Sequence, residues 1–377
     1  MDLRRLLCAA ALAAGTGMIV PAATINYAQQ NLVSDLPGMA PTTDPNLANP
    51  WGIAFSPTSP FWISDNHTGL ATVYTGNGTI RPLVVTIPPP AGGSPPAAPT
   101  GIAFNGGSGF MGDRFVFATE DGTISGWQSG TSATLRASSS GAVYKGLAIA
   151  NNGTGDFLYA ANFSAGRIDV FNSSYQPVSL SGNFSDPDIP AGFAPFDIKT
   201  IGGKLYVTYA LQDAAKEDDV PGPGNGFVNI FDANGHLEQR LIVGDSTGHT
   251  GPLNSPWGLA LAPAGFGAFG GDLLVGNFGD GRINAFNGTT GSFVGTVAPA
   301  HGGPLVNTGL WALSFGNGGM GGDPNALYFT AGIPGPGAVE DHGLFGKITA
   351  VPEPATLLLI GAGLVPIALT RRRWISR

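Results

Sequence analysis

Short stretches of alternating apolar residues, bounded by Gly, Asn and Asp, recur along the whole chain. The most regular stretch has a small residue followed by alternating apolar positions. It occurs six times, at residues 51–55, 100–104, 145–149, 196–198, 257–261 and 311–315. Short β-branched or aromatic stretches between turn residues are typical of β-strands joined by tight turns. The pattern therefore predicts a repeated β-strand rather than helices.

Two further strand-like stretches follow each of these repeats. The first lies at residues 61–64, 114–117, 157–160, 204–207, 272–275 and 326–329. The second lies at residues 69–74, 122–127, 166–171, 226–231, 281–286 and 343–348. A weaker fourth strand closes most units, for example at 83–87 and 239–243. Six units of about 50 residues with four strands each predict an all-β, six-bladed β-propeller.

The sixth unit lacks a fourth strand after Ile348, so the ring needs another segment to close it. Residues 29–35 resemble 239–245 in pattern and stand directly before the first unit. We therefore expect a closing strand at 27–35 that supplies the outer strand of the last blade. The propeller then spans 25–350, with blades starting near residues 50, 99, 144, 195, 256 and 310.

The composition supports this fold class and excludes others. Of 377 residues, 59 are Gly and 31 are Pro, and only 11% are charged. Gly and Pro are poor inside helices, which argues against a helix-rich protein. No G-X-Y period is present, and an apolar fraction of 43% is too high for a disordered chain.

The N-terminus has the features of a secretory signal peptide at residues 1–23. Arg4 and Arg5 are followed by an apolar stretch at 6–14 and by the small residues Ala22 and Ala23. The single cysteine, Cys8, falls within this segment. We therefore expect a signal helix at the N-terminus and a mature chain that has no disulfide.

The C-terminus, residues 351–377, has a short acidic motif, an apolar segment and a basic cluster. The motif and the cluster comprise Val351, Pro352, Glu353, Pro354, Arg371, Arg372 and Arg373. The apolar segment at 355–370 is the predicted anchor helix, and the arginines supply a positive-inside stop. This arrangement resembles the PEP-CTERM sorting signal of Gram-negative bacteria. The resemblance implies that an exosortase-type enzyme is a partner, that the protein reaches the cell envelope, the outer surface or the medium, and that the tail is its only contact with the membrane.

The charge of the remaining chain excludes one class of partner. The two tails carry six of the 17 Lys and Arg residues but few of the 25 Asp and Glu residues. Removing 1–24 and 354–377 leaves 11 basic against 24 acidic residues, a net charge of −13. Such a chain has no basic surface to hold phosphates, so we expect no nucleic-acid binding.

Three segments carry a family resemblance. NSPWGLALAP at 254–263, DLLVGNFGDGRINAF at 272–286 and NTGLWALSFGNG at 307–318 resemble a bacterial family of exported PEP-CTERM propellers. The match runs from about residue 27 to the end. It implies a six-bladed propeller of the NHL or gluconolactonase-like type with that cellular address, but it brings no activity and no catalytic residues.

Propeller topology brings turns from different blades together on one face. The turns that join second and third strands, and the links between blades, meet around the central channel. The polar residues expected there are Asp65, Asn66, Glu120, Asn162, Asn277, Asp280, Asp341 and His342. Carboxylate and amide oxygens suit Ca²⁺, whereas His together with Asp would suit a transition metal. Six-bladed lactonase-like enzymes hold calcium at this place, but Asp and Asn are also ordinary turn residues.

Aromatic residues at the starts of the blades form a second candidate site. Trp51, Phe196, Trp257 and Trp311 occupy equivalent positions and are candidates for stacking on a sugar ring or holding a partner peptide. The alternative is that these rings pack between blades as core. A long charged insertion at 213–226 is expected on the same face, either as a solvated loop or as a lid or cation site.

Two functions remain open from the sequence. We expect a non-enzymatic binding or extracellular-matrix protein at the cell surface, with a polysaccharide or a matrix protein as its partner. The alternative is a calcium-dependent hydrolase or lyase, similar to lactonases, that uses the carboxylates of the top face.

Overall fold

The computed structural model describes residues 26–245, 250–336 and 340–351. These residues form 24 β-strands and two short 3-10 turns, η1 (Phe110–Gly112) and η2 (Gly267–Phe269). No helix in this part of the chain is long and apolar enough to cross a membrane. The expected signal and anchor helices lie outside the described residues.

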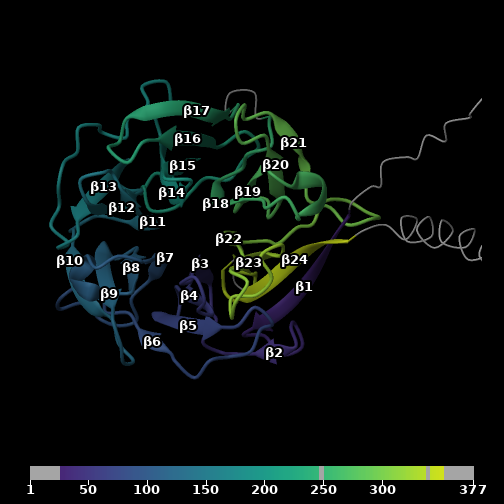
Figure 1. Ribbon diagram of the computed structural model, residues 1–377, viewed down its shortest axis with the longest axis horizontal. Helices are drawn as coiled ribbons and strands as arrows, with labels where there is room; N and C mark the ends of the chain where they lie inside the picture. Colours follow the sequence, from purple (N-terminus) through teal and green to yellow (C-terminus); the bar gives the residue numbers. More distant parts are fainter. Residues whose placement is uncertain (1–25, 246–249, 337–339, 352–377) are drawn as a thin grey trace, which may run out of the picture. The chain divides into compact units, whose positions relative to one another are not determined.

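The strands form six sheets arranged as blades around a ring (Figure 1). Each blade begins with its innermost strand and continues outward, as the repeat predicts. Blades one and two contain β3 (Pro50–Ala54), β4 (Phe61–Asp65), β5 (Leu70–Tyr74) and β6 (Val85–Thr86), then β7 (Pro99–Phe104), β8 (Phe115–Thr119), β9 (Thr123–Trp127) and β10 (Thr134–Ser138). Blades three and four contain β11 (Tyr144–Asn151), β12 (Asp156–Asn162) and β13 (Arg167–Asn172), then β14 (Phe193–Ile201), β15 (Lys204–Leu211), β16 (Phe227–Phe231) and β17 (Leu237–Val243). Blade five contains β18 (Pro256–Leu261), β19 (Leu273–Asn277), β20 (Ile283–Phe286) and β21 (Phe293–Thr296).

The sixth blade is closed by the N-terminal strand, so the closure predicted from the sequence is present. Its order from the centre outward is β22 (Leu310–Phe315), β23 (Leu327–Ala331), β24 (Leu344–Val351), β1 (Asn26–Ser34) and β2 (Thr42–Thr43). β1 pairs antiparallel with β24, whereas the short β2 adds a parallel fifth strand that the sequence did not predict. The first and last strands of the described chain, β1 and β24, therefore pair with each other in one sheet.

Blade three differs from the predicted four strands. Its sheet has only β11, β12 and β13, followed by an isolated bridge between Phe171 and Pro177. Two backbone bonds remain where the strand was expected, from the Val178 N–H to the Val170 carbonyl and from the Asn172 N–H to the Gln176 carbonyl, both at 2.9 Å.

The inner strands approach one another closely, which explains the small residue in each repeat. A Cβ atom added to Gly52 would lie 2.6 Å from the carbonyl oxygen of Thr100, and one added to Gly258 would lie 2.5 Å from that of Trp311. Both neighbours are backbone atoms of the next blade, which cannot move away without shifting a strand. The repeated glycines are therefore required by the packing around the axis.

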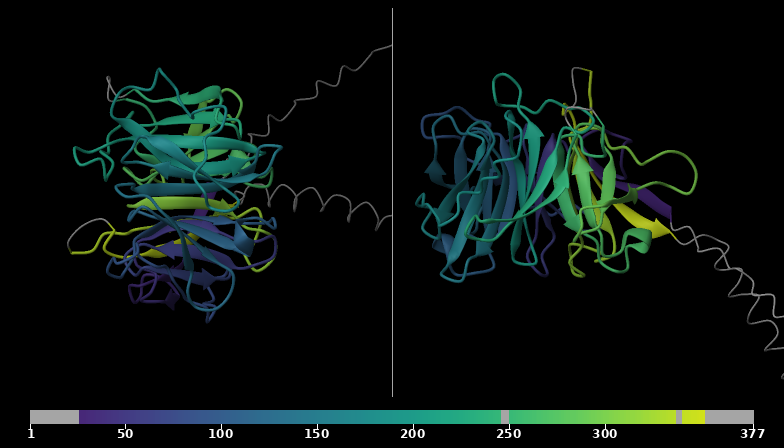
Figure 2. Two further views of the ribbon diagram at one scale, coloured as in Figure 1. Left: turned by 90° about the vertical axis from the view of Figure 1, so that its left-hand side faces the viewer. Right: turned by 90° about the horizontal axis from the view of Figure 1, so that it is seen from above.

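All blades run between the same two faces of the ring (Figure 2). We define the top face as the one where the inner strands begin and where second and third strands are joined. Backbone bonds tie these two features together, for example from the Asn66 N–H to the Asn49 carbonyl at 3.0 Å and from the Phe278 N–H to the Ser255 carbonyl at 2.9 Å. The inner strands end at the opposite, bottom face.

Candidate functional site

The aromatic residues at the blade starts pack against one another near the top of the channel. Trp51, Phe196, Trp257 and Trp311 are between 0% and 4% exposed. Trp51 and Trp311 stack with their ring centres 3.5 Å apart, and Trp257 meets both rings edge-on. Their rings contact each other rather than solvent, which matches the core alternative and leaves no open face for a sugar ring.

A buried lysine lies beside this aromatic group. Lys145 begins the inner strand of blade three at the position that Trp51 holds in blade one, and its side chain is 1% exposed. Its Nζ lies 5.0 Å from the ring centre of Trp51 and 2.5 Å from Oε1 of Glu120. A further contact of 3.4 Å joins Nζ to Oδ1 of Asp218, which lies in the long insertion between β15 and β16. Side chains from blades one, two and four thus surround the ammonium group of Lys145, which belongs to blade three.

Amide side chains extend this polar group across the top face. Asn66 Nδ2 donates to Oε2 of Glu120 at 2.9 Å, and Asn49 Nδ2 donates to Oε1 of Glu340 at 3.0 Å. Trp311 Nε1 donates to Oδ1 of Asn49 at 3.2 Å, which links the polar residues to the aromatic core below. We call Asn49, Asn66, Glu120, Lys145, Asp218, Asp219 and Glu340 the top-face cluster.

Carboxylates outnumber the lysine in this cluster. Burial, followed by the nearby charge of Glu120, raises the pKa of Glu340 to about 7. Burial also raises the pKa of Asp219 to about 6, and Asp218 adds to this effect. For Lys145, burial acts to lower the pKa, but Glu120 and Asp218 outweigh it and hold the pKa above its ordinary value. The lysine therefore stays charged. Glu340 and Asp219, in contrast, are partly protonated near neutral pH and together carry less than two negative charges.

The backbone of this region is held in an unusual conformation. Asn49, Ser255 and Glu340 have φ angles of 48°, 47° and 82°, in the left-handed region that residues other than glycine rarely occupy. Such conformations persist only where the surroundings fix them, and they gather at binding and active sites. In addition, Nε1 of Trp51 and Nε1 of Trp257 are buried and donate no hydrogen bond to the described residues.

The residues predicted as calcium ligands do not form one group. Asn66 contacts Glu120, and Asn277 contacts Asp280 at 3.1 Å. Asn162 instead bonds to Asp169, and His342 lies 2.7 Å from Oδ2 of Asp35. Asp341 precedes His342 in the turn between β23 and β24. Across the described ranges, no set of three or more His, Cys, Asp or Glu side chains is arranged to hold a metal ion.

Asp65 has a different environment from the other predicted ligands. It is fully buried in β4, and neither carboxylate oxygen accepts a hydrogen bond among the described residues. Burial, together with the nearby charge of Asp44, raises its pKa well above the ordinary value. A protonated, buried carboxyl of this kind is part of the interior and is not an available metal ligand.

Sequence reasoning identified part of the cluster and missed the rest. Asn66 and Glu120 were predicted at the top face, and the insertion carrying Asp218 was expected there. Lys145, Asn49 and Glu340 were missed. The alignment of the repeats could have identified Lys145, because it holds a charged residue at a position where four of the six repeats have Trp or Phe.

Comparison with known proteins gives the class of this propeller. Residues 350–373 match the PEP-CTERM protein-sorting motif, which marks an exported surface protein that an exosortase processes. Virginiamycin B lyase from Staphylococcus aureus superimposes with a TM-score of 0.50 over 87% of this chain and 100% of its own, at 13% identity. At that identity the likeness concerns the fold alone.

Two proteins of Acanthamoeba polyphaga mimivirus are more closely related in sequence. Uncharacterized protein R648 is 34% identical over 329 residues, which cover 82% of this chain and 76% of the relative. Uncharacterized protein L690 is 34% identical over 310 residues, covering 77% and 78%. The chain belongs to the same protein family as R648 and L690.

Proposed function

We propose that this protein is a non-enzymatic binding propeller of the cell surface or extracellular matrix, and that it holds a cationic polysaccharide at the top-face cluster. The observation that carries the proposal is the excess of carboxylates around Lys145. Glu120, Asp218, Asp219 and Glu340 surround a single ammonium group. A ligand that brings positive charge relieves the repulsion among these acids.

The chemistry of the cluster favours an amino sugar within that class. Carboxylates bind an ammonium group, and the amides of Asn49 and Asn66 suit hydroxyl groups because each can both donate and accept. The mature chain carries a net charge of −13, which disfavours anionic polysaccharides. The sorting motif supports an extracellular setting in which such polymers occur.

Binding to three matched oligosaccharides tests the proposal. Glucosamine oligomers are cationic, N-acetylglucosamine oligomers of equal length are neutral, and uronic acid oligomers are anionic. The full-length chain is expected to bind the cationic series most tightly, with an affinity that falls as salt is added. Equal binding of all three series, or binding of the anionic series alone, contradicts the proposal.

Two variants locate the binding site. Glu120→Gln and Asp218→Asn each remove one negative charge and are expected to weaken binding of the cationic oligomer by about tenfold, the effect of about 1.4 kcal/mol. Glu238→Gln removes a charge from the exposed ion pair with Lys204 and serves as the matched control. If all three variants behave alike, the top-face cluster is not the site.

An acid–base enzyme is the second candidate, and one observation favours it. Glu340 has a pKa near neutrality and lies beside the charged pair of Lys145 and Glu120. Groups tuned in this way serve as general bases in lyases and hydrolases. A lactone or ester turned over by the wild type but not by Glu340→Gln supports this candidate. The calcium-dependent version stays a prediction, since its expected ligands include Asn side chains as well as carboxylates. A thermal shift on adding Ca²⁺ that a chelator reverses would support it.

A further inference from the structure

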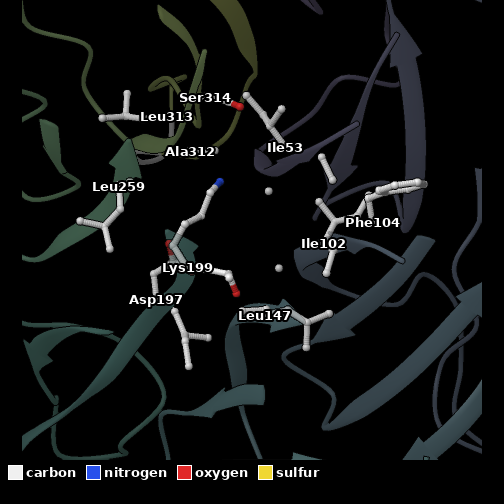
Figure 3. A pocket seen from close by; sticks show the side chains of 18 of the residues that line it. Ile53, Ile102, Phe104, Leu147, Asp197, Lys199, Leu259, Ala312, Leu313 and Ser314 are labelled. Atoms are coloured by element: carbon white, nitrogen blue, oxygen red, sulfur yellow. The ribbon is translucent and has the colours of Figure 1, made fainter. Parts of the chain in front are cut away.

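A second site lies in the central channel, below the aromatic residues of the top face. A cavity of about 290 Å³ is enclosed by the inner strands of all six blades. Most of the residues that line it are apolar, among them Ile53, Ile102, Leu147, Leu259 and Leu313 (Figure 3), but polar atoms provide nearly half of its surface. Trp257 also lines this cavity, and the lining continues to Thr200, which is exposed at the lower end of β14. A cavity of this size is close to the lower limit for small-molecule pockets, so it suits a small ligand.

Two charged side chains interrupt the apolar wall, and both come from blade four. The repeat aligns Asp197 with four glycines and Ala312, and it aligns Lys199 with four alanines and Ser314. Five blades thus place only small residues where blade four places a carboxylate and an amine. Because a strand alternates its side chains, Asp197 and Lys199 lie on the same side of β14. Figure 3 shows the Lys199 amine extending into the opening between β14 and the blades that carry Ile53 and Ala312.

Neither group is neutralised by a partner. Among the described residues, no ion pair within 4.0 Å and no side-chain hydrogen bond involves Lys199, and Asp197 is 4% exposed without an ion pair. Gly146 makes room for the carboxylate, since a Cβ at that position would overlap Asp197 and lie 2.5 Å from its Cα. Asp197 is buried and Lys199 is half-buried. Withdrawing such charges from water without a partner is costly, so their presence in the channel indicates a role there.

We propose that this channel is a second site, separate from the top-face cluster, in which Lys199 binds a small apolar aldehyde or ketone as a reversible imine. The ligand class follows from the cavity. Its apolar residues suit a hydrocarbon body, its size limits that body to a few carbons beyond a ring, and Lys199 is the residue of its lining that offers an amine. An uncharged amine in an apolar pocket adds to carbonyl carbon.

The reaction balances with the groups present. The Nζ lone pair of Lys199 attacks the carbonyl carbon, the C=O π bond breaks, and the oxygen takes a proton from nitrogen to give a carbinolamine. Asp197, as the neutral acid, then protonates the hydroxyl group. The C–O bond breaks, water leaves, and the nitrogen lone pair forms the C=N bond. The products are a protonated imine, a molecule of water and the Asp197 carboxylate as counter-ion, and the reverse steps release the ligand.

The protonation states of the two groups support these roles. Burial lowers the pKa of Lys199, although the charge of Asp197 opposes this effect. Burial raises the pKa of Asp197 to about 7, against the opposing charge of Lys199. At neutral pH the cavity therefore holds more free amine and more neutral acid than the same groups would provide in water.

Reductive trapping tests the proposal without depending on any variant. The full-length chain is incubated with benzaldehyde or hexanal and cyanoborohydride, and modified lysines are located by peptide mass spectrometry. Lys199 is expected to carry about tenfold more adduct than Lys204, an exposed lysine in the next strand. Adducts spread evenly over the exposed lysines, or no adduct on Lys199, would overturn the proposal.

Two variants separate the role of each group. Lys199→Arg keeps the positive charge but cannot form the imine, so the adduct in the channel should disappear. Asp197→Asn keeps the shape and removes the acid, and it should slow trapping at Lys199 by about 100-fold or more. Lys204→Arg is the control and should leave trapping at Lys199 unchanged. Unaltered trapping in Asp197→Asn would show that the carboxyl takes no part in the reaction.

Discussion

Lys145 and Glu120 come from neighbouring blades, and their charged groups meet at 2.5 Å directly above the ring of Trp51. The lysine is buried, whereas the Glu120 side chain is 27% exposed. This contact ties blade two to blade three at the top of the channel. It also fixes the one positive charge around which the other acids of the top face are arranged.

Removing this positive charge should destabilise the fold in a way that depends on pH. Lys145→Met leaves the carboxylates of the cluster without their counter-ion, and we expect a loss of about 3 kcal/mol at pH 7. At pH 5 the loss should be smaller, because Glu340 and Asp219 are then protonated. Urea unfolding at the two pH values measures the difference. An equal loss at both would mean that Lys145 acts through packing alone.

The double variant Lys145→Met with Glu120→Gln should lose less stability than the sum of the losses in the two single variants.

The raised pKa of Glu340 predicts that the wild type is less stable at pH 8 than at pH 5.5. The folded state holds the proton up to about pH 7, whereas the unfolded chain releases it near its ordinary value of 4.5. The folded state therefore binds more protons between these values, so stability falls as the pH rises from about 4.5 to 7 and the full cost is present above that range. Asp197 and Asp219 act in the same direction.

Glu340→Gln isolates this effect. It should raise the melting temperature at pH 8 by a few degrees, corresponding to about 1 kcal/mol after allowance for solvent screening, and change it little at pH 5. Melting followed by circular dichroism at both pH values gives the comparison. A stabilisation of the same size at pH 5 would exclude titration of Glu340 as the cause.

Closure of the ring depends on Tyr27 as well as on the pairing of β1 with β24. The Tyr27 hydroxyl donates to the carbonyl of Phe266 at 2.9 Å, and its ring stacks on Phe269 with the ring centres 5.5 Å apart. Tyr27→Ala is expected to cost about 3–5 kcal/mol, and Tyr27→Phe about 1 kcal/mol. Deleting residues 25–36 should abolish cooperative unfolding of the whole propeller. A deletion with unchanged thermal melting would contradict the closure.

The small residues of the inner strands provide a fourth prediction. Gly146→Ala forces a Cβ into Asp197 of the next blade, and we expect it to cost about 3 kcal/mol and to displace the carboxylate from the channel. Gly303→Ala is the matched control, since nothing lies within 4 Å of a Cβ at that position. Chemical denaturation of the two variants should therefore differ by several kcal/mol, and similar stabilities would contradict the close approach of the inner strands.

Much of the fold could be predicted because the packing of a ring imposes a repeated residue choice. The glycines at 52, 101, 146 and 258 mark inner strands whose neighbours leave no room for a side chain. The fourth strand of blade three was overpredicted, because its segment pairs with β13 only through the isolated bridge between Phe171 and Pro177. β2 consists of two residues and leaves almost no pattern to detect.

The candidate site was harder to predict than the fold. Glu120 and Asn66 could be placed on the top face from topology alone. Lys145 and Glu340 could not, because their roles depend on contacts between blades that lie far apart in sequence. The aromatic residues at the blade starts were predicted at the correct positions. Their burial could not be predicted, because it depends on how closely the four rings pack near the axis, and the spacing in the sequence does not reveal this.

Calorimetry of a glucosamine oligomer binding to the full-length chain at pH 7, repeated in buffers with different ionisation enthalpies, tests the central claim most directly. A cationic ligand at the top-face cluster favours the ionised form of Glu340, so binding should release protons and show a heat that depends on the buffer. Glu340→Gln should bind with a much smaller proton release. Absence of binding, or binding with no proton release in the wild type, would contradict the assignment of this cluster as the ligand site.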